Sequence, residues 1–171
     1  GTEELSSSYG FISVDYEFGD LSDLHALMLS ERDYYMTYSK AVAVEAFYQS
    51  GRPIFLGMDD LQGNWNDVGE LLGPVFGISN AYDADLCSEM ILNEDISITD
   101  GIEETIYPGG AWCSDNDAFE LDGGRSDWLI KDINDHYFGV VNDNKSRTIL
   151  MGENLVGIWG FSEQSTQLNV N

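Results

Sequence analysis

Short apolar runs alternate with helically spaced apolar positions in the first half of the chain, which predicts strands alternating with helices. The clearest helix covers 37–50, where Ala41, Val44 and Tyr48 recur at helical spacing. Gly51 follows it directly and is a typical C-cap residue. The apolar runs that predict strands in this half are 11–16, 25–30 and 53–58.

A second amphipathic pattern follows the third of these runs. Trp65, Val68 and Leu72 share one face of the predicted helix, and Asn64 is its predicted N-cap. The Gly-Pro pair at 73–74 is predicted to end it. Strand–helix–strand–helix order is typical of right-handed βαβ crossovers, so we predict an α/β fold with a mainly parallel sheet flanked by helices.

The second half of the chain is less regular. Its apolar runs predict strands at 90–92, 96–98, 137–141 and 147–151. The polar residues 141–145 between the last two predict a β-hairpin near the C-terminus. The acidic, Gly-rich stretch 109–135 has no periodicity and is predicted to be a long loop, either functional or disordered. We predict a single domain over 10–171, preceded by a disordered segment or linker at 1–9.

Charge narrows the range of partners. The 171 residues include 31 acids and 7 Lys and Arg, for a net charge of −24. Nucleic acid and anionic membrane surfaces both attract basic proteins, so we expect neither as a partner. No apolar run approaches the roughly 18 residues that would span a bilayer, so we expect no membrane insertion.

The same charge bears on location, because salt or divalent cations must screen its self-repulsion. Halophilic cytoplasm and a calcium-containing extracellular medium both supply such ions. The chain has only eight Ala but eleven Asn, which favours the extracellular medium or the cell surface. Cys87 and Cys113 then form either one disulfide or two independent buried thiols. Neither belongs to a C-x-x-C pair, so we expect no zinc site there.

Several segments, taken in order, resemble the class I glutamine amidotransferase-like superfamily. They are residues 21–29, 46–57, 71–78, 96–102 and 147–152. The resemblance extends over about 21–165 and implies a flavodoxin-like, Rossmann-like three-layer sandwich.

The sequence differs from the family pattern at the catalytic residues. Family enzymes carry a nucleophilic Cys in a G-x-C-x-G turn, and the matching residues 57–61 have Asp59 in place of the thiol. The family's His-x-Glu is also missing, because His136 is followed by Tyr137 and Phe138. The chain therefore resembles a divergent member of the superfamily without the catalytic Cys.

Polar and aromatic residues follow two of the predicted parallel strands, at 30–35 and 59–65. Ligands of open α/β sheets bind at the carboxyl ends of strands. Acids beside aromatic rings could stack a sugar ring or bind a peptide, or the rings could simply pack beneath the loops. The candidate ligand-binding residues are Glu31, Asp33, Tyr34, Asp59, Asp60, Gln62 and Trp65.

The densest group of oxygen ligands lies in the acidic stretch. Calcium prefers six to eight oxygen ligands and accepts flexible loops, so we predict a Ca²⁺ site at Asp115, Asp117, Glu120 and Asp122. The alternative is a solvated acidic surface. The two histidines, His25 and His136, have no third ligand nearby in sequence, and His25 is expected to be a core residue of its strand.

These features favour a non-catalytic ligand-binding or accessory module of a larger secreted or cell-surface protein. Its expected partners are the other domains of that protein and a carbohydrate or peptide. The first alternative is a hydrolase that uses carboxylates or a metal in place of the Cys. The second is a structural spacer or interaction domain.

Overall fold

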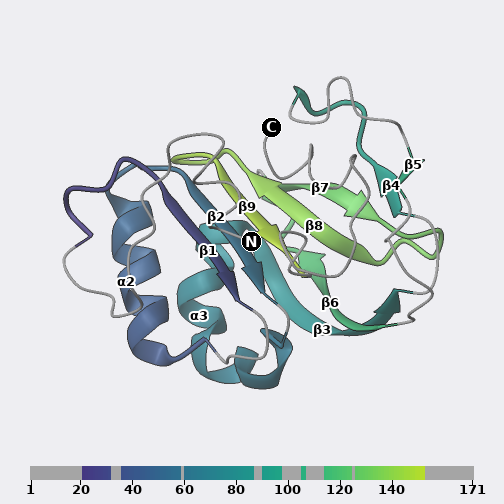
Figure 1. Cartoon of the computed structure of the whole chain (residues 1–171), viewed down its shortest axis with the longest axis horizontal. Coiled ribbons are helices and arrows are strands. Elements are labelled where there is room, and N and C mark those ends of the chain that lie inside the picture. Colours follow the sequence, from purple (N-terminus) through teal and green to yellow (C-terminus); the bar gives the residue numbers. More distant parts are fainter. Residues whose placement is uncertain are drawn as a thin grey trace.

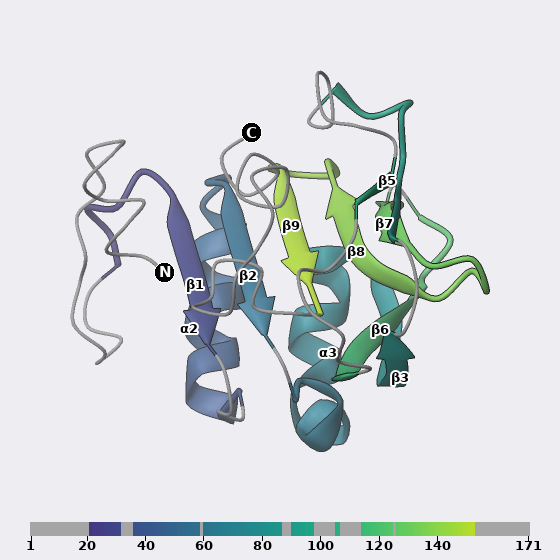
Figure 2. The same ribbon diagram turned by 45° about the vertical axis from the view of Figure 1, so that its right-hand side comes forward.

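One mixed β-sheet with two α-helices packed on one of its faces forms the framework of the computed structural model (Figures 1 and 2). The structure describes residues 21–31, 36–58, 60–86, 90–97, 105–106, 114–124 and 126–152. The elements are β1 (Leu27–Glu31), α2 (Tyr38–Gln49), β2 (Ile54–Met58), the 3-10 turn η1 (Gln62–Asn64), α3 (Trp65–Phe76), β3 (Ile78–Leu86), β4 (Met90–Leu92), β5 (Thr105–Ile106), β6 (Ser114–Leu121), β7 (Ser126–Lys131), β8 (Tyr137–Asn142) and β9 (Thr148–Met151).

The parallel part of the sheet consists of β1, β2 and β9. Leu29 of β1 pairs with Leu56 of β2, and Leu56 pairs in turn with Leu150 of β9. Figure 2 shows α2 behind β1 and β2, and α3 behind β9. The strands predicted at 25–30, 53–58 and 147–151 are confirmed, and the α/β class with them.

The rest of the sheet is antiparallel, so the prediction of a mainly parallel sheet is wrong. Among the described strand pairings, β1–β2 and β2–β9 are parallel, whereas β8 pairs antiparallel with β9, β7 and β6. The pairs β4–β5, β4–β7 and β3–β6 are antiparallel as well. Short turns connect antiparallel strands without crossover helices, and both described helices lie on one face. The predicted C-terminal hairpin is confirmed as β8 and β9.

The stretch 109–135 is not a long loop, because β6 and β7 lie within it. The β7–β8 register shifts between Trp128 and Ile130, and this bulge hides the alternation that would predict β7. The strand predicted at 96–98 is also wrong for its described part. Ile96 lies in a turn, where its N–H donates to Asn93 O at 3.3 Å.

One of the two helices ends where the sequence predicts, and the other does not. Helix α2 begins after Thr37 and is followed by Gly51 at φ +78°, as expected. Helix α3 continues through Pro74 to Phe76, although the proline removes one backbone hydrogen bond of the last turn. It ends at Gly77, whose φ of +71° suits glycine and whose N–H donates to Gly73 O at 2.7 Å.

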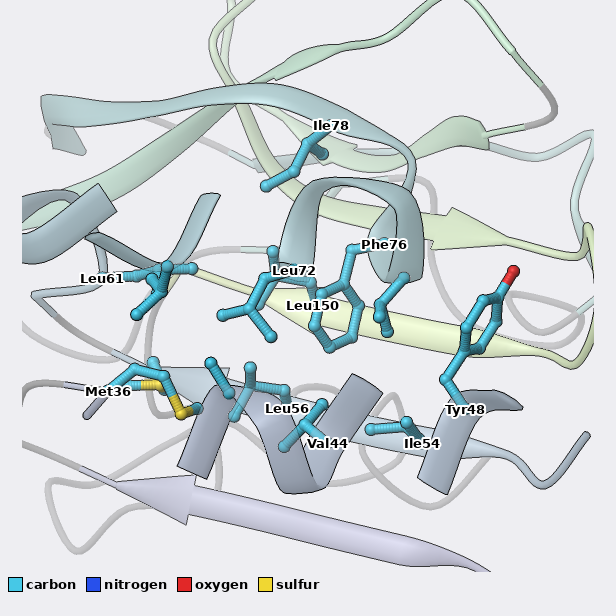
Figure 3. Packing of buried hydrophobic residues seen from close by; sticks show 14 of the residues in the cluster. Met36, Val44, Tyr48, Ile54, Leu56, Leu61, Leu72, Phe76, Ile78 and Leu150 are labelled. Atoms are coloured by element: carbon cyan, nitrogen blue, oxygen red, sulfur yellow. The ribbon is translucent and has the colours of Figure 1, made fainter. Parts of the chain in front are cut away.

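The main core lies between the two helices and the parallel strands (Figure 3). Phe76 and Leu72 of α3 point toward Leu56 and Leu150 of the sheet, and Val44 of α2 closes the layer. A second cluster on the other side of the sheet contains Met90, Leu92, Leu129, Ile130, Phe138 and Met151. Neither of the described α-helices combines the length and apolar character that crossing a membrane requires.

Several sequence predictions concern residues outside the described ranges. They are the segment 1–9, the strand at 11–16, and Cys87 and Cys113. His25 is not a core residue: it is exposed, because β1 begins only at Leu27, whose N–H donates to Pro53 O.

Candidate functional site

The carboxyl ends of β1, β2 and β9 lie at one edge of the sheet, because these neighbouring strands are parallel. Glu31 at the end of β1 pairs with Met58 at the end of β2. Gly57 of β2 pairs with Met151 at the end of β9. The two polar stretches predicted as a binding site therefore leave the sheet at the same edge. Asp33, Tyr34 and Asp59 lie outside the described residues, and only the backbone of Glu31 is described.

The turn after β2 presents backbone N–H groups to this edge. Asp60 has φ +75°, a left-handed conformation that Asp tolerates better than most residues. This conformation leads into η1, whose first N–H groups have no partner within the turn. Leu61 N donates to Asp117 Oδ2 at 2.5 Å, and Gln62 N lies 3.4 Å from both carboxylate oxygens of Asp117.

Asp117 reaches this turn from the antiparallel part of the sheet and is 1% exposed. Its own N–H donates to Gly152 O at 3.1 Å, and Gly152 N donates to Phe138 O at 2.8 Å. A Cβ at Gly152 would lie 1.8 Å from Asp117 O, so a side chain cannot fit there. Strand β6 thus lies directly against the end of β9. Ligands of α/β sheets bind at this edge, and here the buried carboxylate of Asp117 lies there.

Trp65 does not stand free as a stacking platform. It is half-buried against the main core, and a Cβ at Gly69 would lie 2.7 Å from its ring. The indole therefore packs along its own helix. This agrees with the alternative prediction in that the ring is packed and is not free to stack on a ligand. Asp60 and Gln62 are both partly exposed beside Asp117 and remain candidates for ligand contact.

Among the predicted calcium ligands, the structure places Asp117 and Glu120 on opposite faces of the sheet. Asp117 points toward the main core, whereas Glu120, three positions along β6, is exposed on the opposite face. Asp122 Oδ1 accepts Gly124 N at 2.7 Å and Ser126 Oγ at 3.3 Å. The side chain of Asp115 is outside the described residues. In the described part of the chain, no group of three or more His, Cys, Asp or Glu side chains is arranged to hold a metal ion.

Sequence reasoning missed a second buried carboxylate, in the turn between β7 and β8. Asp132 is 1% exposed, and its Oδ1 accepts the N–H groups of Asn134 and His136, both at 2.9 Å. Its Oδ2 accepts Asn134 Nδ2 at 3.2 Å and lies 3.1 Å from His136 Nδ1. Burial alone would raise the pKa of Asp132, but these hydrogen bonds from His136 and Asn134 outweigh it and lower the pKa. The Asp-x-Asn-x-His spacing, which favours an Asx-type turn, was the available signal.

The His136 ring is set among other rings on the same side of the sheet. It meets Tyr82 edge-on, with ring centroids 6.2 Å apart, and Phe138 edge-on at 6.3 Å. Burial raises the pKa of the Tyr82 phenol, and the negative charges of Glu120 and Asp132 raise it further. Tyr82 therefore keeps its proton at neutral pH.

Comparison with known proteins supports the fold and not more. No family model matches the sequence, and no curated protein does. The structure is similar to a crystal structure described as a GMP synthase subunit from Thermoplasma acidophilum, with a TM-score of 0.59. The two chains are 9% identical, and the similarity covers 88% of this chain and 71% of the other. The resemblance to glutamine amidotransferases thus holds at the level of the fold.

Proposed function

We propose that the chain is a non-catalytic ligand-binding or accessory module of a larger secreted or cell-surface protein. One observation carries the proposal: the N–H groups of Leu61 and Gln62 are already engaged by the buried Asp117 carboxylate. Acyl-transfer sites need backbone donors that are free to stabilise a developing oxyanion. The carboxylate of Asp117 leaves neither of these two donors for a substrate.

The residues around this turn support the same proposal. The resemblance implies a thiol nucleophile within 57–61, and the chain has Asp59 at that position. His136 lies in the β7–β8 turn, where its Nδ1 is paired with Asp132. The hydrolase alternative would use the partly exposed Asp60 as its carboxylate. Among the described contacts, none gives Asp60 a basic partner.

The exposed acids suit a role at the surface of a larger protein. We propose neighbouring domains as one partner, and a carbohydrate or peptide bound near Asp60 and Gln62 as the ligand. Carboxylate and amide side chains accept and donate hydrogen bonds to hydroxyl or peptide groups. Calcium bound by Asp115, Asp117, Glu120 and Asp122 stays a prediction.

Two measurements on the purified chain test this proposal. The first is hydrolysis of glutamine and of p-nitrophenyl acetate, for which we expect no turnover above buffer. Turnover that Asp60→Asn abolishes would support the hydrolase instead. The second is a glycan and peptide array, on which we expect binding that Asp60→Ala weakens about tenfold. Asp127→Ala, an exposed acid on β7, is the matched control, and equal losses in both variants would argue against this site.

A further inference from the structure

Glu120 of β6 and His136, the residue directly before β8, lie next to a described strand pair. Phe119 of β6 pairs with Tyr137 of β8, so the next position of that register places Glu120 opposite His136. Side chains next to a paired position point to the other face, so both of these point to the same face. Directly opposed residues have Cβ atoms about 4.5–5.5 Å apart, within reach of a shared ligand.

The imidazole of His136 is oriented by its turn. Asp132 Oδ2 lies 3.1 Å from Nδ1, and the rings of Tyr82 and Phe138 meet the imidazole edge-on. The His136 side chain is 39% exposed. Nε2 of His136 has no hydrogen-bond partner among the described residues, and with Nδ1 directed at Asp132 its lone pair is available to a ligand.

This arrangement has the chemistry of a metal ligand. Histidines that bind metals usually donate their other ring N–H to a carboxylate, as His136 does toward Asp132. Imidazole nitrogen favours zinc, copper and nickel, whereas calcium and magnesium prefer sites made of oxygen alone. Glu120 supplies a carboxylate beside the nitrogen, and the acidic protein around it attracts cations.

We propose that His136 and Glu120 together bind a divalent transition-metal ion, Zn²⁺ or the more tightly held Cu²⁺. Asp132 is the positioning residue that fixes the imidazole with Nε2 outward. Water molecules complete the coordination of the ion. Glu120 is also one of the predicted calcium ligands. In this proposal it binds a different metal, on the face of the sheet opposite Asp117.

The chain contains a matched control, since His25 is its other histidine and is also exposed. The experiment is calorimetric titration of the whole chain with ZnCl₂, with about 5 mM CaCl₂ present throughout to occupy carboxylate-only sites. We expect one zinc to bind to the wild type and to His25→Asn with the same affinity. We expect His136→Asn to lose at least tenfold in affinity and Glu120→Gln about tenfold, and Asp132→Asn to fall roughly 10–100-fold.

Two further readouts separate binding from unfolding. Circular dichroism must show that each variant is folded, and the NMR signals of the His136 ring must shift with zinc while those of His25 do not. Unchanged affinity in His136→Asn or in Glu120→Gln would overturn the proposal, as would loss of zinc binding in excess calcium. Equal losses in His25→Asn and His136→Asn would overturn it too. None of these results depends on the proposed non-catalytic role.

Discussion

Asp117 and Asp132 are both buried carboxylates, but distant residues satisfy one and neighbouring residues satisfy the other. Asp117 accepts hydrogen bonds from the N–H groups of Leu61 and Gln62, which lie far from it in the sequence. Asp132 accepts four hydrogen-bond contacts from residues within its own turn. Both meet the requirement that a buried charge be hydrogen-bonded.

The difference shows what each carboxylate holds together. The Asp132 turn can form as soon as β7 and β8 pair, because its partners are two and four residues away. The Asp117 contact exists only when the turn after β2, strand β6 and the end of β9 have all assembled. Asp117 therefore reports on the joining of the parallel and antiparallel parts, and Asp132 reports on one hairpin.

The largest expected effect is at the junction that brings Asp117 into place. Gly152→Ala puts a methyl group 1.8 Å from Asp117 O, so β6 must move away from β9. We expect the free energy of unfolding to fall by at least about 3 kcal/mol, the upper end of the cost of overpacking. Urea unfolding followed by fluorescence measures it. Gly124→Ala is the control, since it meets only the Asp122 carboxylate, and a comparable loss there would contradict this account.

Removing the distant carboxylate itself comes next. Asp117→Ala leaves the Leu61 and Gln62 N–H groups without an acceptor, which costs about 2–3 kcal/mol. Asp117→Asn keeps one carbonyl oxygen for Leu61 N and should cost roughly half as much. The same unfolding experiment distinguishes them. If Ala and Asn behave alike, the contact with the turn after β2 does not stabilise the fold.

The smallest effect is at the local carboxylate, where pH sharpens the comparison. The folded pKa of Asp132 is lowered, so its stabilisation is complete above the unfolded value of about 3.9. It is lost as pH falls through the folded pKa. We expect Asp132→Asn to cost about 1 kcal/mol at pH 7 and to differ little from wild type near pH 2. Asp127→Asn controls for the lost charge, and a gap from wild type that stays constant with pH would refute the linkage.

The sequence predicted the elements whose pattern is local. Ala41, Val44 and Tyr48 identify α2 because a helix repeats within the segment itself. Strand β7 was missed because a bulge breaks its alternation, and β6 was missed because its partner β3 lies elsewhere in the chain. Pro74 misled the prediction of the end of α3 because the helix continues for two residues beyond it.

The candidate sites also separate into features that follow from local pattern and features that depend on the three-dimensional fold. The shared edge at the ends of β1 and β2 follows from parallel strands, and the structure has it. Nothing near Asp117 in the sequence indicates that Leu61 is its partner, because that contact depends on the three-dimensional fold. Glu120 and His136 are likewise brought to neighbouring positions only by the pairing of β6 with β8.

The position of β9 sets the order in which the chain can be completed during synthesis. It lies between β2 and β8, yet it follows all the other described strands in the sequence. Until residues 148–151 leave the ribosome, β2 and β8 each expose an unpaired edge, and such edges invite pairing with other chains. The nascent protein therefore depends on its last described strand to protect two edges at once. Chaperone demand should be greatest just before that strand emerges.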